Sequence, residues 1–265
     1  MLPSPYRVYA IRYASLQRRS PDNFIGGDEH DTDMPLAYYV WVIVGGGRTI
    51  VVDTGFDQHV GAKRGREMLH PVEDGLLALD IAPDGVRDVI ITHMHYDHSG
   101  NHALLPNARF HLQDSEMAFA TGRCMCHRLL RGAYEADDVA QMVLRVFENR
   151  VQFHDGAGKI APGVEVHHVG GHTRGLQVVR VLTERGWVVL ASDASHFYAH
   201  MDQGRAFPIV YQIDALLEGY ATLHRLASST AHIVPGHDPL VLQRYPAARP
   251  GTEGWIVRLD VDPIV

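Results

Sequence analysis

Cysteine is scarce in this chain, and only two occur among its 265 residues, Cys124 and Cys126. Cysteines separated by a single residue are poorly placed for an intrachain disulfide, because the bond requires a particular spacing and direction of the two side chains. We therefore expect two free thiols. Free thiols persist in reducing compartments, so the sequence predicts a cytoplasmic protein.

Long apolar runs are also missing. No stretch reaches the roughly 18 apolar residues that a membrane-spanning helix needs. Residues 1–16 mix Pro3, Pro5, Arg7 and Arg12 into the apolar positions, unlike the uninterrupted apolar region of a signal peptide. The sequence therefore predicts no membrane partner.

Positive charge is not in excess either, since the formal net charge is -7. A chain with this balance has no overall basic surface for a phosphate backbone, so we expect no nucleic-acid partner and a small neutral or acyl substrate. Hydrophobic residues make up 46% of the chain, which is enough for one substantial core. No linker or repeat divides it, so we expect a single domain over residues 1–265 and leave the oligomeric state open.

Short segments rich in β-branched and aromatic residues recur along the chain and predict strands. They lie at 36–44, 49–52, 89–92, 109–112, 164–169, 176–182 and 187–192. Residues 45–48 predict a glycine hairpin between the first two. Helical spacing of apolar residues predicts helices at 114–121, 133–149 and 214–228. Helices among strands indicate a layered α/β fold. The polar segment 22–33 predicts a loop, either a solvated connection or a wall of the binding site.

The densest group of metal-binding side chains follows the strand expected at 89–92. It contains His93, His95, Asp97 and His98. The two residues His93 and His95 can project from the same side of an extended segment, and the other two follow where the chain turns. This arrangement suits two neighbouring metal ions better than one.

Three later positions repeat the pattern of an apolar strand that delivers a metal-binding side chain to a turn. They are His172, Asp193 and His237. Together with the first four they make seven ligands, enough for two ions that share one carboxylate. Imidazole and carboxylate donors favour zinc, although iron, manganese and cobalt accept them too. Asp53 ends its strand and is either a residue that orients a metal-bound histidine or a turn stabiliser.

These motifs resemble those of the metallo-β-lactamase superfamily over about residues 36–240. The matching segments are His93-Met-His-Tyr-Asp-His98, Gly171-His172-Thr173, Ser192-Asp193-Ala194, Pro235-Gly236-His237-Asp238 and Val51-Val52-Asp53-Thr54-Gly55. The resemblance implies an αββα sandwich, with two sheets face to face, helices outside and the metals at one edge. It also implies the division of the ligands: His93, His95 and His172 for one divalent ion, Asp97, His98 and His237 for the other, and Asp193 for both.

Within the superfamily the chain is most similar to the N-acyl homoserine lactonases, on residues 171–177, 193–195 and 235–238. This resemblance implies that two metal ions supply hydroxide at neutral pH and that the hydroxide opens an N-acyl homoserine lactone or a related cyclic ester. Asp97 would carry the proton to the leaving alkoxide. These lactonases commonly carry a tyrosine three residues after the bridging aspartate, and here His196 stands there. We expect His196 or Tyr198 to donate a hydrogen bond to the substrate, unless His196 only lines the pocket.

Three other functions remain open. A glyoxalase II-type thioesterase would use the same metals, but no basic cluster for a glutathione-like tail is evident in the sequence. A phosphodiesterase or RNA-processing enzyme fits the acidic net charge poorly. A non-catalytic metal-binding protein on the same fold would be expected to lose some of the seven ligands.

Overall fold

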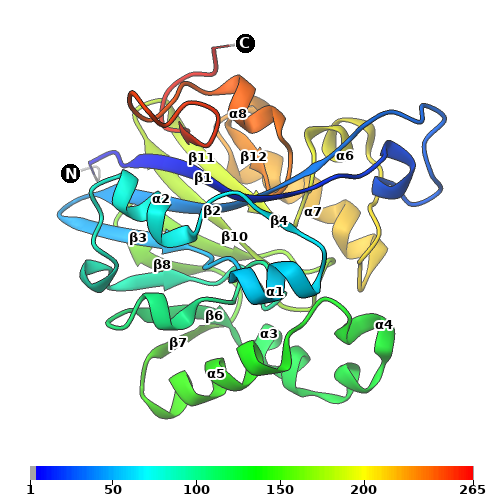
Figure 1. Cartoon of the computed structure of the whole chain (residues 1–265), viewed down its shortest axis with the longest axis horizontal. Coiled ribbons are helices and arrows are strands. Elements are labelled where there is room, and N and C mark those ends of the chain that lie inside the picture. The colour runs from blue at the N-terminus through cyan, green and yellow to red at the C-terminus, as the bar shows by residue number, and fades with distance from the viewer. Residues whose placement is uncertain (1–3, 265) are drawn as a thin grey trace.

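Two β-sheets packed face to face, with helices on their outer sides, make up the computed structural model, which describes residues 4–264 (Figure 1). The first sheet has the order β13 (Ile256–Arg258), β1 (Arg7–Leu16), β2 (Leu36–Gly45), β3 (Arg48–Val52), β5 (Asp88–Ile90), β6 (Arg109–Gln113) and β7 (Val151–His154), with β4 (Glu67–Met68) beside β1. The second has the order β12 (Ile233–Pro235), β11 (Gly186–Ser192), β10 (Gln177–Thr183), β9 (Val164–His168) and β8 (Gly158–Ala161).

Eight α-helices connect or cover these strands in the described range. They are α1 (Gln58–Lys63), α2 (Val72–Ala78), α3 (Asp114–Thr121), α4 (Arg128–Arg131), α5 (Ala136–Phe147), α6 (Tyr198–Gln203), α7 (Ile213–Leu226) and α8 (Leu240–Arg244). Phe119 of α3 and Met142 of α5 pack against the first sheet, and Leu216 and Leu223 of α7 pack with residues of the second. The predicted αββα arrangement is therefore confirmed.

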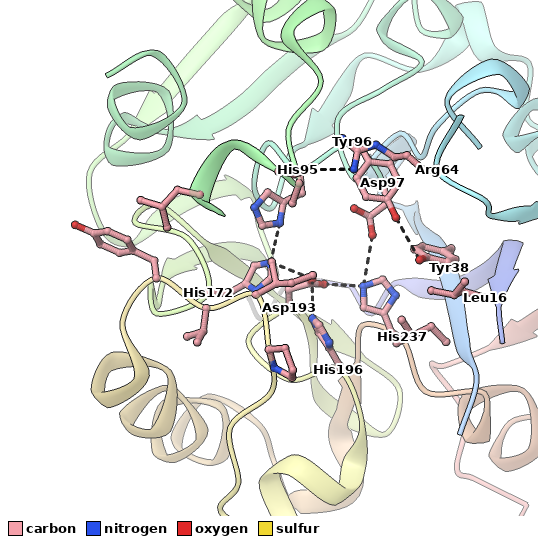
Figure 2. A pocket seen from close by; sticks show the side chains of 18 of the residues that line it. Leu16, Tyr38, Arg64, His95, Tyr96, Asp97, His172, Asp193, His196 and His237 are labelled. Carbon is pink, nitrogen blue, oxygen red and sulfur yellow. Dashed lines mark hydrogen bonds and ion pairs between the residues drawn. The ribbon is translucent and has the colours of Figure 1, made fainter. Parts of the chain in front are cut away.

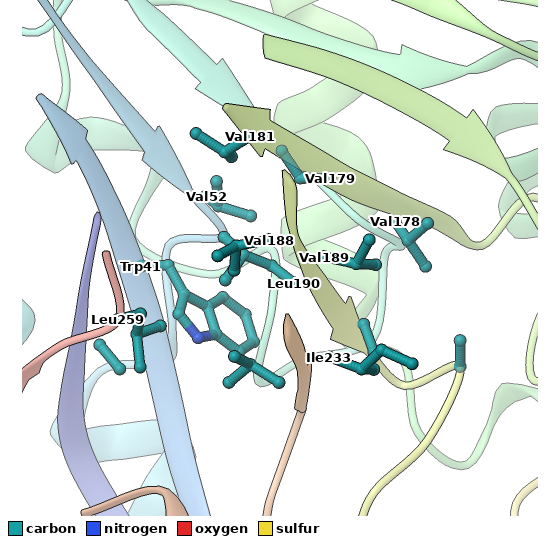
Figure 3. Close-up of a cluster of buried hydrophobic side chains, with 14 of the residues drawn as sticks. Trp41, Val52, Val178, Val179, Val181, Val188, Val189, Leu190, Ile233 and Leu259 are labelled. Atoms are coloured by element: carbon teal, nitrogen blue, oxygen red, sulfur yellow. The ribbon is translucent and has the colours of Figure 1, made fainter. Parts of the chain in front are cut away.

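Strand β2 explains how the two layers of core form from one segment. Its side chains alternate between the faces of the sheet. Residues 37, 39, 41 and 43 join the core between the sheets, and residues 38, 40 and 42 join the core under the helices. Trp41 is fully buried and packs in the same core as the valines and Leu190 of β11 and Ile233 of β12 (Figure 3). A strand buried on both faces needs the nearly continuous apolar composition that β2 has.

The seven predicted strands and three predicted helices all overlap observed elements, with ends displaced by up to three residues. The hairpin at 45–48 is also confirmed, since Gly45 pairs with Arg48. Gly46 and Gly47 between them have φ angles of 57° and 73°, as a tight two-residue turn requires. Strand β1 was not predicted. It lies between β13 and β2 with most of both faces buried, so its sequence lacks the polar alternation that marks a half-exposed strand.

None of the helices in residues 4–264 combines the length and the apolar character that crossing a bilayer requires.

Candidate metal centre

All seven predicted ligands lie together at one end of the two sheets. His93, His95, Asp97 and His98 follow β5, His172 lies in the turn between β9 and β10, Asp193 follows β11 and His237 follows β12. Each is buried, with no more than 7% of its surface exposed. Figure 2 shows five of them, His95, Asp97, His172, Asp193 and His237, pointing toward one another across the pocket.

The backbone approaches closely at Gly236, directly before His237. A Cβ atom there would lie 2.6 Å from the Ser192 carbonyl oxygen and 2.9 Å from Asp193 Oδ1. Only glycine leaves room for the two loops to meet at this distance. The Pro-Gly-His sequence therefore brings the imidazole of His237 beside the carboxylate of Asp193.

Three histidines form the first half of the centre. His93 Nε2 lies 3.0 Å from His95 Nδ1. His172 Nε2 lies 3.2 Å from His93 Nε2 and 2.8 Å from His95 Nδ1. Burial lowers the pKa of His93 and His95 well below the usual value and that of His172 to about 4. The rings are therefore neutral, which is the form that binds a metal ion. A divalent cation among these closely spaced nitrogen atoms would bind their lone pairs.

Asp97, His98 and His237 form the second half. Asp97 Oδ2 lies 3.4 Å from His98 Nε2 and 3.7 Å from His237 Nε2. Asp193 stands between the halves: its Oδ1 is 3.2 Å from His98 Nε2 and 3.1 Å from His237 Nε2, while its Oδ2 is 3.2 Å from His172 Nε2. The ligand atoms of His93, His95 and His172, and those of Asp97, His98 and His237, each lie within 4.8 Å of one another. One carboxylate thus reaches both groups.

The outer nitrogen atoms of two histidines are held by oxygen acceptors. His98 Nδ1 lies 2.8 Å from Asp53 Oδ2, and His237 Nδ1 lies 2.9 Å from the Ala37 carbonyl oxygen. Asp53 also accepts hydrogen bonds from the backbone N–H and the hydroxyl of Thr92. A proton on each Nδ1 leaves Nε2 with a lone pair facing the centre. Asp53 thus occupies the orienting position considered for it from the sequence.

A buried acid that the sequence analysis did not single out, Glu116 on α3, connects two of the ligand loops. Its carboxylate accepts hydrogen bonds from Met94 N (2.9 Å), Gly175 N (3.0 Å), the Thr173 hydroxyl (2.6 Å) and the Tyr134 hydroxyl (3.0 Å). Met94 separates His93 from His95, and Thr173 follows His172, so this side chain fixes one loop against the other. The helical spacing of Glu116 with the apolar residues Phe119 and Ala120, which are also buried, could have revealed it.

His196 reaches the centre. Its ring stacks on Phe207 with centroids 3.6 Å apart, and its Nε2 lies 3.0 Å from Asp193 Oδ2. Burial lowers the pKa of His196 to about 3, so the ring is neutral and has one N–H to donate.

Tyr198 does not reach the centre, although the sequence predicted it as a substrate contact. It is the first residue of α6, and its ring lies under the Arg244 guanidinium, 3.9 Å from the centroid to Cζ. Its backbone N–H donates to Asp238, and its side chain belongs to the core between the layers rather than to the pocket lining. The start of the helix turns this side chain away from the site, so the structure does not support the role predicted for it.

A pocket of about 570 Å³ opens over the centre. One part of its lining is apolar and includes Phe119, Leu129 and Ile209, while Arg18 and Arg66 contribute positive charge. The loop predicted at 22–33 contributes Ile25, so this segment forms part of the wall, as one of its two interpretations held. The volume is typical of a site for a small molecule.

The fold and the buried histidine and aspartate cluster define the class to which this chain belongs. The family model of the metallo-beta-lactamase superfamily matches residues 33–242, and the chain is a member of that superfamily.

Among individual proteins, an N-acyl homoserine lactonase from a Bacillus species is 28% identical over 118 residues. The match covers 43% of this chain and 40% of that protein, so it spans about two fifths of the relative's length. The predicted resemblance to the superfamily and to its lactonases is thus confirmed.

Solved structures share the fold over nearly the whole chain. A quorum-quenching N-acyl homoserine lactone lactonase superposes with a TM-score of 0.74 at 21% identity, covering 90% of this chain and 94% of that one. A probable metal-dependent hydrolase from Staphylococcus aureus gives 0.74 at 13% identity, with 100% and 97% covered. A dizinc quorum-quenching lactonase in complex with a product gives 0.68 at 14% identity, with 89% of each chain covered.

Proposed function

We propose that this protein is a binuclear metal-dependent hydrolase that opens a lactone, either an N-acyl homoserine lactone or a related cyclic ester. The observation that carries the proposal is the position of Asp193, whose two oxygen atoms face different groups of ligands. The proposal draws further support from lactonases among the similar proteins. Quorum quenching is the physiological role that we propose for this reaction.

The donor set fits two divalent ions. In this proposal His93, His95 and His172 hold one ion, Asp97, His98 and His237 hold the other, and Asp193 contacts both. His98 Nε2 and Asp193 Oδ1 are buried and 3.2 Å apart, yet neither makes a hydrogen bond within residues 4–264. Burying polar atoms without partners is costly, and a cation between them would remove that cost. Imidazole and carboxylate ligands favour zinc, with iron, manganese or cobalt as alternatives.

When bound, two such ions supply a hydroxide nucleophile at neutral pH and polarise the carbonyl of an ester. Side chains of the protein would then transfer the proton. Asp97 lines the pocket, with its Oδ2 3.4 Å from His98 Nε2, and would pass a proton to the leaving alkoxide. His196 is the candidate donor to the substrate. To donate to the substrate, His196 would have to give up its 3.0 Å contact with Asp193. Otherwise His196 holds Asp193 in place.

The test is hydrolysis by the full chain after loading with zinc and measurement of its metal content. We expect ring opening of N-acyl homoserine lactones, loss of the reaction when a chelator removes the metal, and recovery when zinc is returned. If metal-loaded protein opens no member of a broad panel of lactones, the proposed reaction is wrong.

A glyoxalase II-type thioesterase is the second candidate, and one observation favours it. Arg18, Arg64 and Arg66 all line the pocket, and the fold brings the distant Arg18 to the same cavity as the other two. Such side chains could bind the carboxylates of a glutathione-like tail. Comparing kcat/KM for S-lactoylglutathione and for N-acyl homoserine lactones on the same protein sample decides between the two reactions.

We further propose that residues 1–265 form one domain and that the protein works in the cytoplasm. The domain proposal is supported by a core that draws on both sheets, although residues 1–3 and 265 lie outside the described residues. The location is supported by the two free cysteines, Cys124 and Cys126.

A further inference from the structure

Three arginines line the pocket, but their charges are not equally neutralised. Arg64 Nε lies 2.7 Å from Glu135 Oε1, and its other nitrogen atoms donate to backbone carbonyl groups. In contrast, no carboxylate of the described residues lies within 4.0 Å of a guanidinium nitrogen of Arg18 or Arg66. These two side chains therefore bring positive charge that is not paired with a carboxylate of the described residues to a pocket in a protein whose net charge is -7.

Both side chains are half-buried and near each other. Arg66 Nε donates to the Tyr96 hydroxyl at 2.9 Å and its Nη1 donates to the Arg64 carbonyl, while Arg18 Nη2 donates to the Asp22 carbonyl. Burial lowers the pKa of Arg18, the charge of Asp22 opposes this, and the charge of Arg66 lowers the pKa further. Two guanidinium groups close enough to repel each other, with no carboxylate paired to either among the described residues, would stabilise an anionic ligand between them.

The arginine pair borders one particular half of the metal centre. Tyr96, which accepts from Arg66, is adjacent to Asp97 and donates its hydroxyl to that of Tyr38 at 3.2 Å. The Tyr38 ring packs edge-on against His237, with centroids 5.2 Å apart. Figure 2 shows Tyr38 and Tyr96 on the side of Asp97 and His237, away from His172. The positive wall thus lies beside the half formed by Asp97, His98 and His237.

The other half of the centre borders an apolar wall. Tyr211 N–H donates to the carbonyl groups of Gly171 and His172, and its ring packs on Phe119 with centroids 4.8 Å apart. Ile209 lies two residues before Tyr211 and also lines the pocket. A ligand with its reacting carbonyl at the centre would therefore meet positive charge on one side and apolar side chains on the other.

We propose that the substrate is an ester or lactone that carries a carboxylate, and that Arg18 and Arg66 bind this carboxylate while an apolar part of the molecule lies against Phe119 and Ile209. Guanidinium groups bind carboxylates through short, charge-assisted hydrogen bonds. This inference rests on the proposed lactone hydrolysis and adds the substrate class. A neutral acyl chain alone would leave both arginines without a partner.

The test compares two substrates that differ in one group. One is a homoserine lactone whose N-acyl chain is adipoyl, ending in a carboxylate, and the other has a carboxamide at that end. With zinc-loaded wild type we expect KM for the carboxylate form to be lower by about tenfold or more, and the difference to shrink as salt is added. Equal KM values for the two forms would overturn the inference while leaving lactone hydrolysis intact.

Variants locate the effect. Arg18→Gln should raise KM for the carboxylate form toward that of the carboxamide form, so that the ratio of the two KM values approaches one. Arg18 is the better choice than Arg66, because within residues 4–264 its side chain makes a hydrogen bond only to the Asp22 carbonyl. Arg48→Gln is the matched control, because Arg48 is exposed on the hairpin outside the pocket. This substitution removes the same charge as Arg18→Gln. If Arg48→Gln has the same effect as Arg18→Gln, the pair does not form a specific site.

A binding measurement separates this inference from the proposed reaction. Lactam analogues of the two substrates, with the ring oxygen replaced by N–H, resist hydrolysis and can be titrated calorimetrically into the zinc-loaded chain. We expect tighter binding of the carboxylate form to wild type and loss of that advantage in Arg18→Gln at unchanged zinc content. Should neither lactone be hydrolysed, this result still supports the anion site, whereas equal binding of both analogues by wild type rejects it.

Discussion

The metal centre and the pocket walls of this protein are constructed in different ways. The candidate ligands are buried, follow the ends of strands, and are held by carboxylates such as Asp53 and Glu116 that are themselves buried. The walls come from several separate segments, among them the helices α3 and α4 and the loop before α7, and Leu129 and Ile209 remain largely exposed. This difference indicates that the centre sets the chemistry and the walls set the choice of substrate. Substitutions in the two regions should therefore have distinct effects.

The largest effect is expected from Asp193→Asn. This change removes the charge that both groups of ligands share, so each ion loses a partner and the buried histidines lose their common anion. We expect hydrolysis to fall at least about a thousandfold, equivalent to roughly 4 kcal/mol of transition-state stabilisation, together with loss of metal. Kinetics and elemental analysis of one sample measure both. Asp202→Asn, at an exposed position on α6, is the control, and a variant at position 193 with full metal content and activity would contradict the proposed centre.

A smaller effect, on stability, is expected from Glu116→Gln. An amide has one acceptor oxygen, so some of the four groups that donate to Glu116 would lose their acceptor in a buried site. We expect the free energy of unfolding of the metal-free chain to fall by about 1–3 kcal/mol, as measured in urea. The exposed Glu73→Gln on α2 should leave it unchanged. Equal stability of the Glu116 variant and the wild type would mean that this carboxylate does not hold the ligand loops.

The same difference between centre and walls explains what could be predicted from the sequence. The candidate ligands stand in short motifs after apolar strands, so His93 and His172 were recognisable without a structure. The site residues Arg18 and Arg66 were not, because they come from different segments and meet only after β4 pairs with β1. Glu116 was missed because a single acid in a helix resembles a surface residue. Tyr198 was wrongly expected at the site, since the sequence did not reveal that α6 begins there and points this ring into the core.

At Ile209, in the pocket wall, one substitution should raise the stability and at the same time weaken substrate binding. Its φ angle is 64°, in the left-handed region that β-branched residues rarely adopt, and 56% of its surface is exposed. Such strain costs on the order of 1–3 kcal/mol, and glycine removes it at an entropic cost of roughly 0.5–1 kcal/mol. We expect Ile209→Gly to unfold at a slightly higher temperature while KM for long-chain substrates rises a few fold.

Ile25→Gly is the matched control for this change, because Ile25 also lines the pocket and is 43% exposed but has no positive φ angle. It should raise KM in a similar way and lower the stability. If the two variants change the melting temperature in the same direction, strain at Ile209 does not contribute measurably.

The smallest effect is expected in the pH dependence of stability, and it comes from Asp138, whose carboxyl group is close to Glu135. Burial, followed by the neighbouring charge of Glu135, raises the pKa of Asp138 on α5 to about 7. This carboxyl binds its proton more tightly in the folded protein than in the unfolded chain. Its contribution therefore favours folding at acidic pH and disappears as the pH rises from about 4 through about 7.

Asp138→Asn should remove this dependence. We expect the variant and the wild type to melt at similar temperatures at pH 5, and the wild type to melt a few degrees lower than the variant at pH 8, where its buried carboxylate is ionised. Thermal unfolding followed by circular dichroism across this range measures the difference. Asp137→Asn, at the exposed neighbouring position on α5, should reproduce only a small part of it, because the charge of Asp137 raises the pKa of Asp138 less than burial and Glu135 do. Because the metal ligands are untouched, hydrolysis at pH 7 should stay unchanged in both variants, and a loss of metal from either would show that wall and centre are coupled.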